Sequence, residues 1–167
     1  MIEYVLSSLG FMIALMLQYG IFSRWTLLSG CADLVLLFII ALCLNSDAKR
    51  LWIMILIFGA IVGAISALPF FVPLLFYFAV FLSAQEIRKR IMQTPLLSMY
   101  LLTFVATLAW HGINIALLFI NRVPFDLSTA LFEILLPSVL LNILLSMLIH
   151  AIVQEANRMI TPKGAEA

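Results

Sequence analysis

The sequence predicts an all-helical integral membrane protein, built as a compact bundle of six transmembrane helices. Hydrophobic residues make up 65% of its 167 residues and charged residues 10%, and the mean hydropathy is +1.21. Soluble domains are roughly 45 to 50% apolar and about 25% charged. The apolar residues form six long stretches, and Lys and Arg collect in the short gaps between them and in the tail. A soluble fold is therefore excluded.

Each apolar stretch is predicted to cross the membrane once, because a crossing of about 30 Å takes roughly 20 apolar residues. The third and fourth stretches are separated only by Pro69 and Pro73, which disfavour helix in the residues before them. This spacing predicts a tight turn at the membrane surface, and the alternative is five spans with a re-entrant segment there. The predicted spans of this single transmembrane domain are 4–22, 28–44, 51–68, 69–84, 96–120 and 129–154.

The distribution of Lys and Arg predicts that both termini are cytoplasmic, since cytoplasmic loops retain these residues. In that orientation the outer side holds only Arg24 and Arg122, and the reverse orientation would invert the bias. Trp25 and Trp52 stand at span edges, where interfacial aromatic residues are common. The inner side would hold Lys49, Arg50, Arg88, Lys89, Arg90, Arg158 and Lys163.

No catalytic, cofactor-binding or metal-binding motif is evident, so we expect neither an enzyme nor a cofactor. Cys31 and Cys43 have no second pair with which to form a zinc site and are expected to be packing residues. The gaps between spans leave no room for a nucleotide-binding domain. The basic run at 88–90 is interpreted as a topology anchor near anionic lipid, with partner binding as the alternative.

Polar residues inside spans must find partners within the protein, and two rows of them stand in the last two spans. If these spans form an antiparallel hairpin around Asp126, His111 lies level with Asn142, and the rows can hydrogen-bond across the hairpin. The same spacing places Thr107 level with Ser146, and Thr103 level with His150. The candidate polar network consists of Thr103, Thr107, His111, Asn114, Ser138, Asn142, Ser146 and His150.

For each polar residue a structural role is favoured over a functional one. Ser and Thr in membrane helices usually bond their own backbone. His111 is the best single candidate for a proton relay or ligand, but a hydrogen-bonded packing histidine is the favoured interpretation. His150 is expected near the cytoplasmic end, within reach of water.

Proline and acidic residues predict local features of two spans. Pro137 leaves the carbonyl of Glu133 without its helical donor and predicts a kink. Asp126 or Ser128 can cap the start of this last helix. Asp33 suits a helix N-terminus and could meet Arg24 of the same outer loop.

Small residues repeat every fourth position in the third span, at Gly59, Gly63 and Ala67. This spacing lets two membrane helices approach closely. Packing within the chain is favoured over contact with another chain, and Gly10 with Ala14 forms a weaker version in the first span.

Four motifs resemble, in their order along nearly the whole chain, those of the bacterial rod shape-determining protein MreD family. The spacing from Pro137 to Asn142 is the most specific of them. Ala32 stands where the family often has Pro, and Ala67 where it often has a carboxylate, so a role for that carboxylate is in doubt. The matching residues are 14–18 ending in Gln18, 33–37 starting with Asp33, Gly59 with Gly63, and Leu136-Pro137 with Asn142.

This resemblance implies a non-enzymatic scaffold in the bacterial cytoplasmic membrane that belongs to the cell-elongation complex and helps regulate peptidoglycan synthesis and cell shape. It implies direct binding to MreC. Contacts with RodA and its penicillin-binding transpeptidase, RodZ and MreB would be made through the complex, and no nucleic acid is implied. MreC's membrane helix is expected on the small-residue face, and its adjoining outer segment on the outer rim.

A different class remains as the alternative. The substrate-binding subunits of energy-coupling-factor vitamin transporters are also six-span chains of similar size, and the MreD family resembles their fold. Such a subunit needs an outward pocket, for which His111, Asn114 and Glu133 could serve. The short outer loops argue against it.

Overall fold

The computed structural model describes residues 2–22, 29–46, 50–90 and 95–160, and these ranges contain helices and no β-strand. Two of the elements, η1 and η2, are π-helices. The elements are α1 (Ile2–Leu17), η1 (Gln18–Phe22), α2 (Leu34–Asn45), α3 (Leu51–Ile65), α4 (Phe71–Arg90), α5 (Pro95–Ile120), α6 (Leu127–Thr129), η2 (Ala130–Leu135) and α7 (Leu136–Ile160).

Three helical segments are long and apolar enough to cross a membrane, which confirms the predicted helical membrane protein at this level. They are Phe71–Lys89, Pro95–Ile120 and the continuous Leu127–Met159. The remaining apolar helices are shorter, at Tyr4–Gly20, Leu34–Asn45 and Leu51–Ile65.

The second predicted span differs from the structure at its start, because the helix begins only at Leu34. Residues 29–33 are not helical, because their backbone bonds to other parts of the protein instead. At other ends, α3 stops at Ile65, whereas α4 and α7 continue to Arg90 and Ile160, beyond the predicted spans. The predicted turn forms at 66–70. Pro73 is tolerated inside α4, because the N–H groups of a first helical turn have no helical partner.

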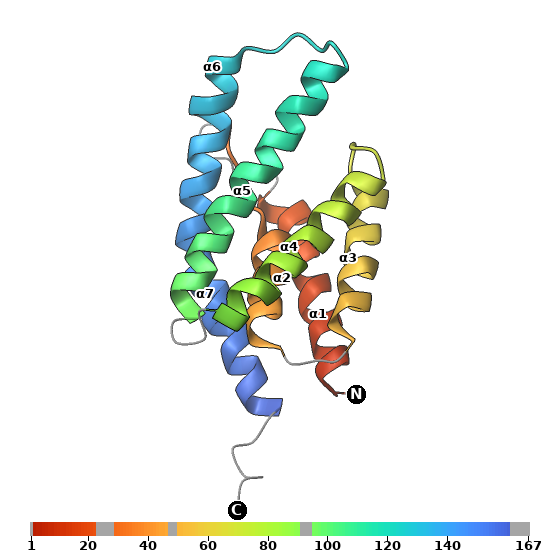
Figure 1. Ribbon diagram of the computed structural model, residues 1–167, viewed down its shortest axis with the longest axis vertical. Helices are drawn as coiled ribbons and strands as arrows, with labels where there is room; N and C mark the ends of the chain where they lie inside the picture. Colours follow the sequence, from red (N-terminus) through yellow and green to blue (C-terminus); the bar gives the residue numbers. More distant parts are fainter. Residues whose placement is uncertain (1, 23–28, 47–49, 91–94, 161–167) are drawn as a thin grey trace, which may run out of the picture.

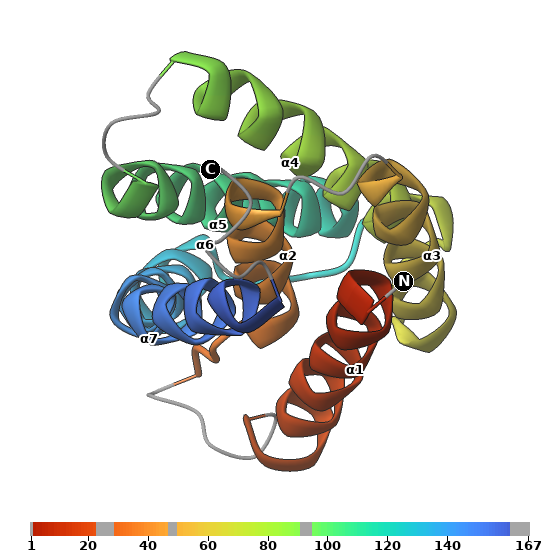
Figure 2. The same cartoon turned by 90° about the horizontal axis from the view of Figure 1, so that it is seen from below.

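The short helix α2 lies at the centre of the bundle and contacts α1, α4, α5 and α7. Figure 2 shows it surrounded by the longer helices. Its side chains at 34–37 and 39–44 are buried. The outer surfaces of the surrounding helices are apolar and exposed, for example at Val5, Leu75 and Leu144. This distribution, with an apolar surface around an apolar core, suits a hydrocarbon environment.

The two ends of the bundle differ in charge. In Figure 1, α3 begins, and α4 and α7 end, toward the lower end, whereas the connection from α5 to α6 forms the upper end. Arg50, Arg88, Lys89 and Arg158 therefore gather toward the lower end, and Arg122 lies at the upper one. Arg88 also donates a hydrogen bond of 2.7 Å to the carbonyl of Ser46, just after α2.

At the upper end Asp126 caps α6, as the sequence predicted. Its carboxylate accepts hydrogen bonds from the backbone N–H of Thr129 (2.9 Å) and from the Thr129 hydroxyl (2.6 Å). These bonds hold the pKa of Asp126 below its ordinary value.

Candidate functional site

The extended segment 29–33, which precedes α2, is the most unusual feature of the bundle, and we call it the break. Backbone N–H groups of alternate residues in the break point to the last long helix. Ser29 donates to the carbonyl of Glu133 (3.1 Å), Cys31 to the Ser138 hydroxyl (3.1 Å) and Asp33 to the Asn142 side-chain oxygen (2.8 Å). These bonds give the N–H groups of Ser29, Cys31 and Asp33 partners within the protein, as an apolar surrounding requires of non-helical backbone.

Pro137 leaves one of these acceptors, the carbonyl of Glu133, free to bond the break. Because proline has no N–H, the carbonyl of Glu133 lacks its helical donor, and Ser29 supplies the missing bond. The π-helix η2 ends at Leu135, two residues before Pro137, and the kink predicted at Pro137 stays a prediction. Short π-helical turns inside α-helices occur frequently at functional sites.

Gly30 lets the break approach α7 closely. A Cβ atom at this position would lie 2.7 Å from the carbonyl oxygen of Ile134, 2.8 Å from the nitrogen of Ser138 and 2.9 Å from Cβ of Pro137. Any larger residue would push the two segments apart. Gly30 was not among the predicted site residues, and its position three residues before the predicted capping residue Asp33 was the only local signal for it.

The first helix closes the break from another side. Gln18, in the π-helix η1, accepts a hydrogen bond of 2.8 Å from the N–H of Val35. Asp33 accepts one of 2.9 Å from the N–H of Leu36, so it caps α2 as predicted. Gln18 also bonds the Asp33 carboxylate. The suggested pair of Asp33 with Arg24 lies outside the described residues.

The fifth helix reaches the break through Asn142, whose side-chain nitrogen donates to the Thr107 hydroxyl at 3.0 Å. The predicted polar contact between the last two spans therefore forms, but the predicted register is wrong by four residues. Asn142 meets Thr107 rather than His111, because the hairpin turns at the connection 121–126, which is centred before Asp126.

The other predicted polar residues are distributed along the same two helices. His150 is buried rather than close to water, and its Nδ1 lies 3.2 Å from the side-chain nitrogen of Asn45 on α2. Ser146 and Asn114 bond carbonyls of their own helices. The Thr103 hydroxyl is buried without a hydrogen-bond partner.

The small-residue face of α3 is occupied by α4. A Cβ at Gly59 would lie 2.9 Å from Cα of Leu74, and one at Gly63 would lie 2.5 Å from the carbonyl oxygen of Phe70. Ala67 follows the end of α3 and is exposed. The favoured interpretation, packing within the chain, thus holds for the two glycines. The expectation that a partner helix packs on this face is wrong, because the face is already covered.

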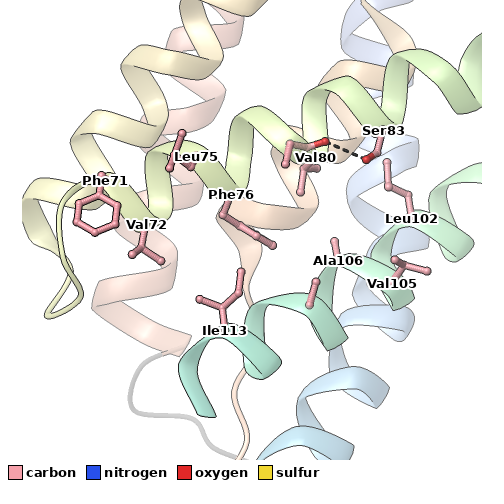
Figure 3. Close-up of a pocket in the computed structure, with 12 residues that line it drawn as sticks. Phe71, Val72, Leu75, Phe76, Val80, Ser83, Leu102, Val105, Ala106 and Ile113 are labelled. Carbon is pink, nitrogen blue, oxygen red and sulfur yellow. Dashed lines mark hydrogen bonds between the residues drawn. The ribbon is translucent and has the colours of Figure 1, made fainter. Parts of the chain in front are cut away.

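An apolar groove of about 410 Å³ runs between α4 and α5. Figure 3 shows Phe76 and Val80 of α4 on one side and Ala106 and Ile113 of α5 on the other. Its lining is apolar apart from Ser83, whose hydroxyl bonds its own helix at the carbonyl of Ala79. Among the described residues, no group of three His, Cys, Asp or Glu side chains is placed to hold a metal ion.

The break and the start of α2 are connected to η1 and to the last long helix by side chains that accept hydrogen bonds from backbone N–H groups, and Asn142 extends this connection to Thr107 of α5. Its chemistry is that of a rigid structural joint. No model of a known protein family, no curated protein and no solved structure matches this chain significantly.

Proposed function

We propose that this chain is an MreD-type scaffold of the bacterial cell-elongation complex, which resides in the cytoplasmic membrane and binds MreC. The observation that supports this proposal best is that residues of the motifs resembling the MreD family lie together at the break. Gln18, Asp33, Pro137 and Asn142 are up to 124 positions apart, yet all four contribute to the break. Because these residues build one joint, each of them is needed for it, which explains why motifs so far apart in the sequence occur together.

The proposal includes six crossings with both termini cytoplasmic. Helix α2 spans about 18 Å at 1.5 Å per residue, which is too short for a bilayer. The five residues of the break add about 16 Å at roughly 3.3 Å per residue. Together they reach about 34 Å, enough for the second crossing. The basic residues at the end where α3 begins favour that end as the cytoplasmic one.

The outer rim, at the upper end of the bundle, is the proposed contact for the segment of MreC outside the membrane. The small-residue face is not open to MreC's membrane helix, because α4 covers it. The upper end of the bundle exposes Phe119, Ile120, Leu127 and Phe132. Contiguous exposed apolar surface commonly marks protein or membrane contacts. An elongated partner that leaves the membrane beside this end would cover it.

Co-purification tests the proposal. The tagged, detergent-solubilised chain should retain MreC when the two are expressed together. Phe132→Ser, on the outer rim, should reduce the retained MreC several-fold. Met159→Ser, an equally exposed position at the other end of the last long helix, should leave it unchanged. Failure to retain MreC overturns the proposal, and a bound vitamin detected by mass spectrometry would favour the transporter subunit instead.

A further inference from the structure

We propose that α5 can occupy two registers on α7, one helical turn apart, and that the structure holds the one in which α5 projects further toward the connection 121–126. This inference concerns a movement within the bundle and goes beyond the proposed scaffold function. It rests on the spacing of the polar rows, on polar groups left without partners, and on the space beside α5.

The spacing makes a second register possible. Thr103, Thr107 and His111 recur every four residues on α5, as Ser138, Asn142, Ser146 and His150 do on α7. A slide of four residues, about 6 Å with a rotation of about 40°, therefore brings one row onto the other again. One-turn displacements of this kind are a known form of switching between packed elements.

The observed register leaves polar groups on both sides of the bonded Thr107 unsatisfied. Thr103 is fully buried, and its hydroxyl has no partner, which is uncommon because buried polar groups are almost always hydrogen-bonded. Among the described residues, His111 has no hydrogen-bond partner, and its side chain is partly exposed.

The second register would give both residues a partner. His111 would replace Thr107 as acceptor for the side-chain nitrogen of Asn142, while Asn142 keeps its bond to Asp33. Thr103 would reach the level of His150. Since Nδ1 of His150 faces the amide nitrogen of Asn45, its Nε2 carries the proton and can donate to the Thr103 hydroxyl.

The moving part is α5, because the break fixes the last long helix to α2 through three hydrogen bonds. Between α5 and α4 lies the apolar groove. Trp110 packs on Phe76 with a ring separation of 4.7 Å, one turn from Ala106, which lines the groove. A slide of one turn moves Trp110 to the level that Ala106 now occupies, beside the groove seen in Figure 3. The groove thus provides space for the largest side chain that has to move.

Distances between spin labels test the two registers in full-length protein reconstituted in lipid bilayers. Labels at Ile120 on α5 and Ile57 on α3, both exposed, are placed in a background that lacks Cys31 and Cys43. We expect two distance populations that differ by several Å. The control pair is Leu144 with Ile57. Leu144 lies on the fixed helix, so this pair should give one population.

Two variants link the populations to the proposed contacts. Ala79→Phe fills the groove from the α4 side and should leave only the register seen in the structure. Leu82→Phe, on α4 but outside this groove, should leave both populations. His111→Leu removes the second partner of Asn142 and should reduce the second population several-fold. A single population in the unmodified protein, or two populations that neither Ala79→Phe nor His111→Leu changes, would overturn the proposal.

Discussion

Asn142 is the single residue that connects most parts of the site. It is almost fully buried, accepts a hydrogen bond from the N–H of Asp33 and donates one to Thr107. One amide side chain therefore ties the break, α7 and α5 together. An amide suits this position because it offers an acceptor and two donors in one planar group.

Asn142→Leu should destabilise the protein. The substitution leaves the half-buried N–H of Asp33 without its partner and removes the buried bond to Thr107. A buried polar group left unsatisfied costs about 1 to 3 kcal/mol, so we expect the free energy of unfolding to fall by about that amount. Denaturation in mixed micelles measures it. The matched control is Asn114→Leu, whose side chain bonds only Trp110 of its own helix and which should change stability little. Equal effects of the two substitutions would contradict the assignment.

At the scale of elements, the bundle uses two kinds of close approach. In the α3–α4 hairpin, Gly59 and Gly63 allow two regular helices to touch along their backbones. At the break, Gly30 allows an extended segment to touch the turn around Pro137. Without a hydrophobic drive between helices in lipid, close packing and hydrogen bonds hold them together, and these glycines permit both.

Gly63→Leu should separate α3 from α4. Its first side-chain atom would meet the backbone of Phe70, which cannot move like the end of a flexible side chain. We expect loss of folded protein, measured as the monodisperse fraction in size-exclusion chromatography. Gly112→Ala is the control, because no atom outside its own helix backbone lies within 4 Å of a Cβ there and Ala favours a helix over Gly by about 0.5 to 1 kcal/mol. Folded Gly63→Leu protein at the unmodified yield would show that the face is not packed internally.

At the scale of the whole molecule, a short buried helix is enclosed by longer ones with exposed apolar surfaces. The basic residues gather toward the end at which α3 begins and α7 ends, and the connection between α5 and α6 forms the opposite end. The bundle is therefore polarised along its long axis. The bias of Lys and Arg predicts that the end with more of these residues faces the cytoplasm.

Cysteine labelling checks this orientation. In a background without Cys31 and Cys43, Val123→Cys should react with a membrane-impermeant maleimide in spheroplasts. Met159→Cys should react only after the membrane is permeabilised, because it lies at the opposite end. Both native positions are exposed. Labelling of the two positions from the same side would contradict the predicted topology, and exchanged reactivity would reverse it.

The sequence by itself determined the membrane character, the turn near Pro69, the capping roles of Asp33 and Asp126, and the carbonyl freed by Pro137. Each of these follows from hydropathy or from the backbone chemistry of one residue. Tertiary structure alone decided that the chain before α2 is extended and that the helix begins only at Leu34. Residues 29–33 carry no local signal against helix apart from one glycine, and their conformation depends on acceptors more than 100 positions away. The pairing of Asn142 with Thr107 was likewise decided by tertiary structure, because it depends on where the connection 121–126 turns. Polar rows that repeat every four residues can pair at more than one offset, so the sequence leaves this choice open.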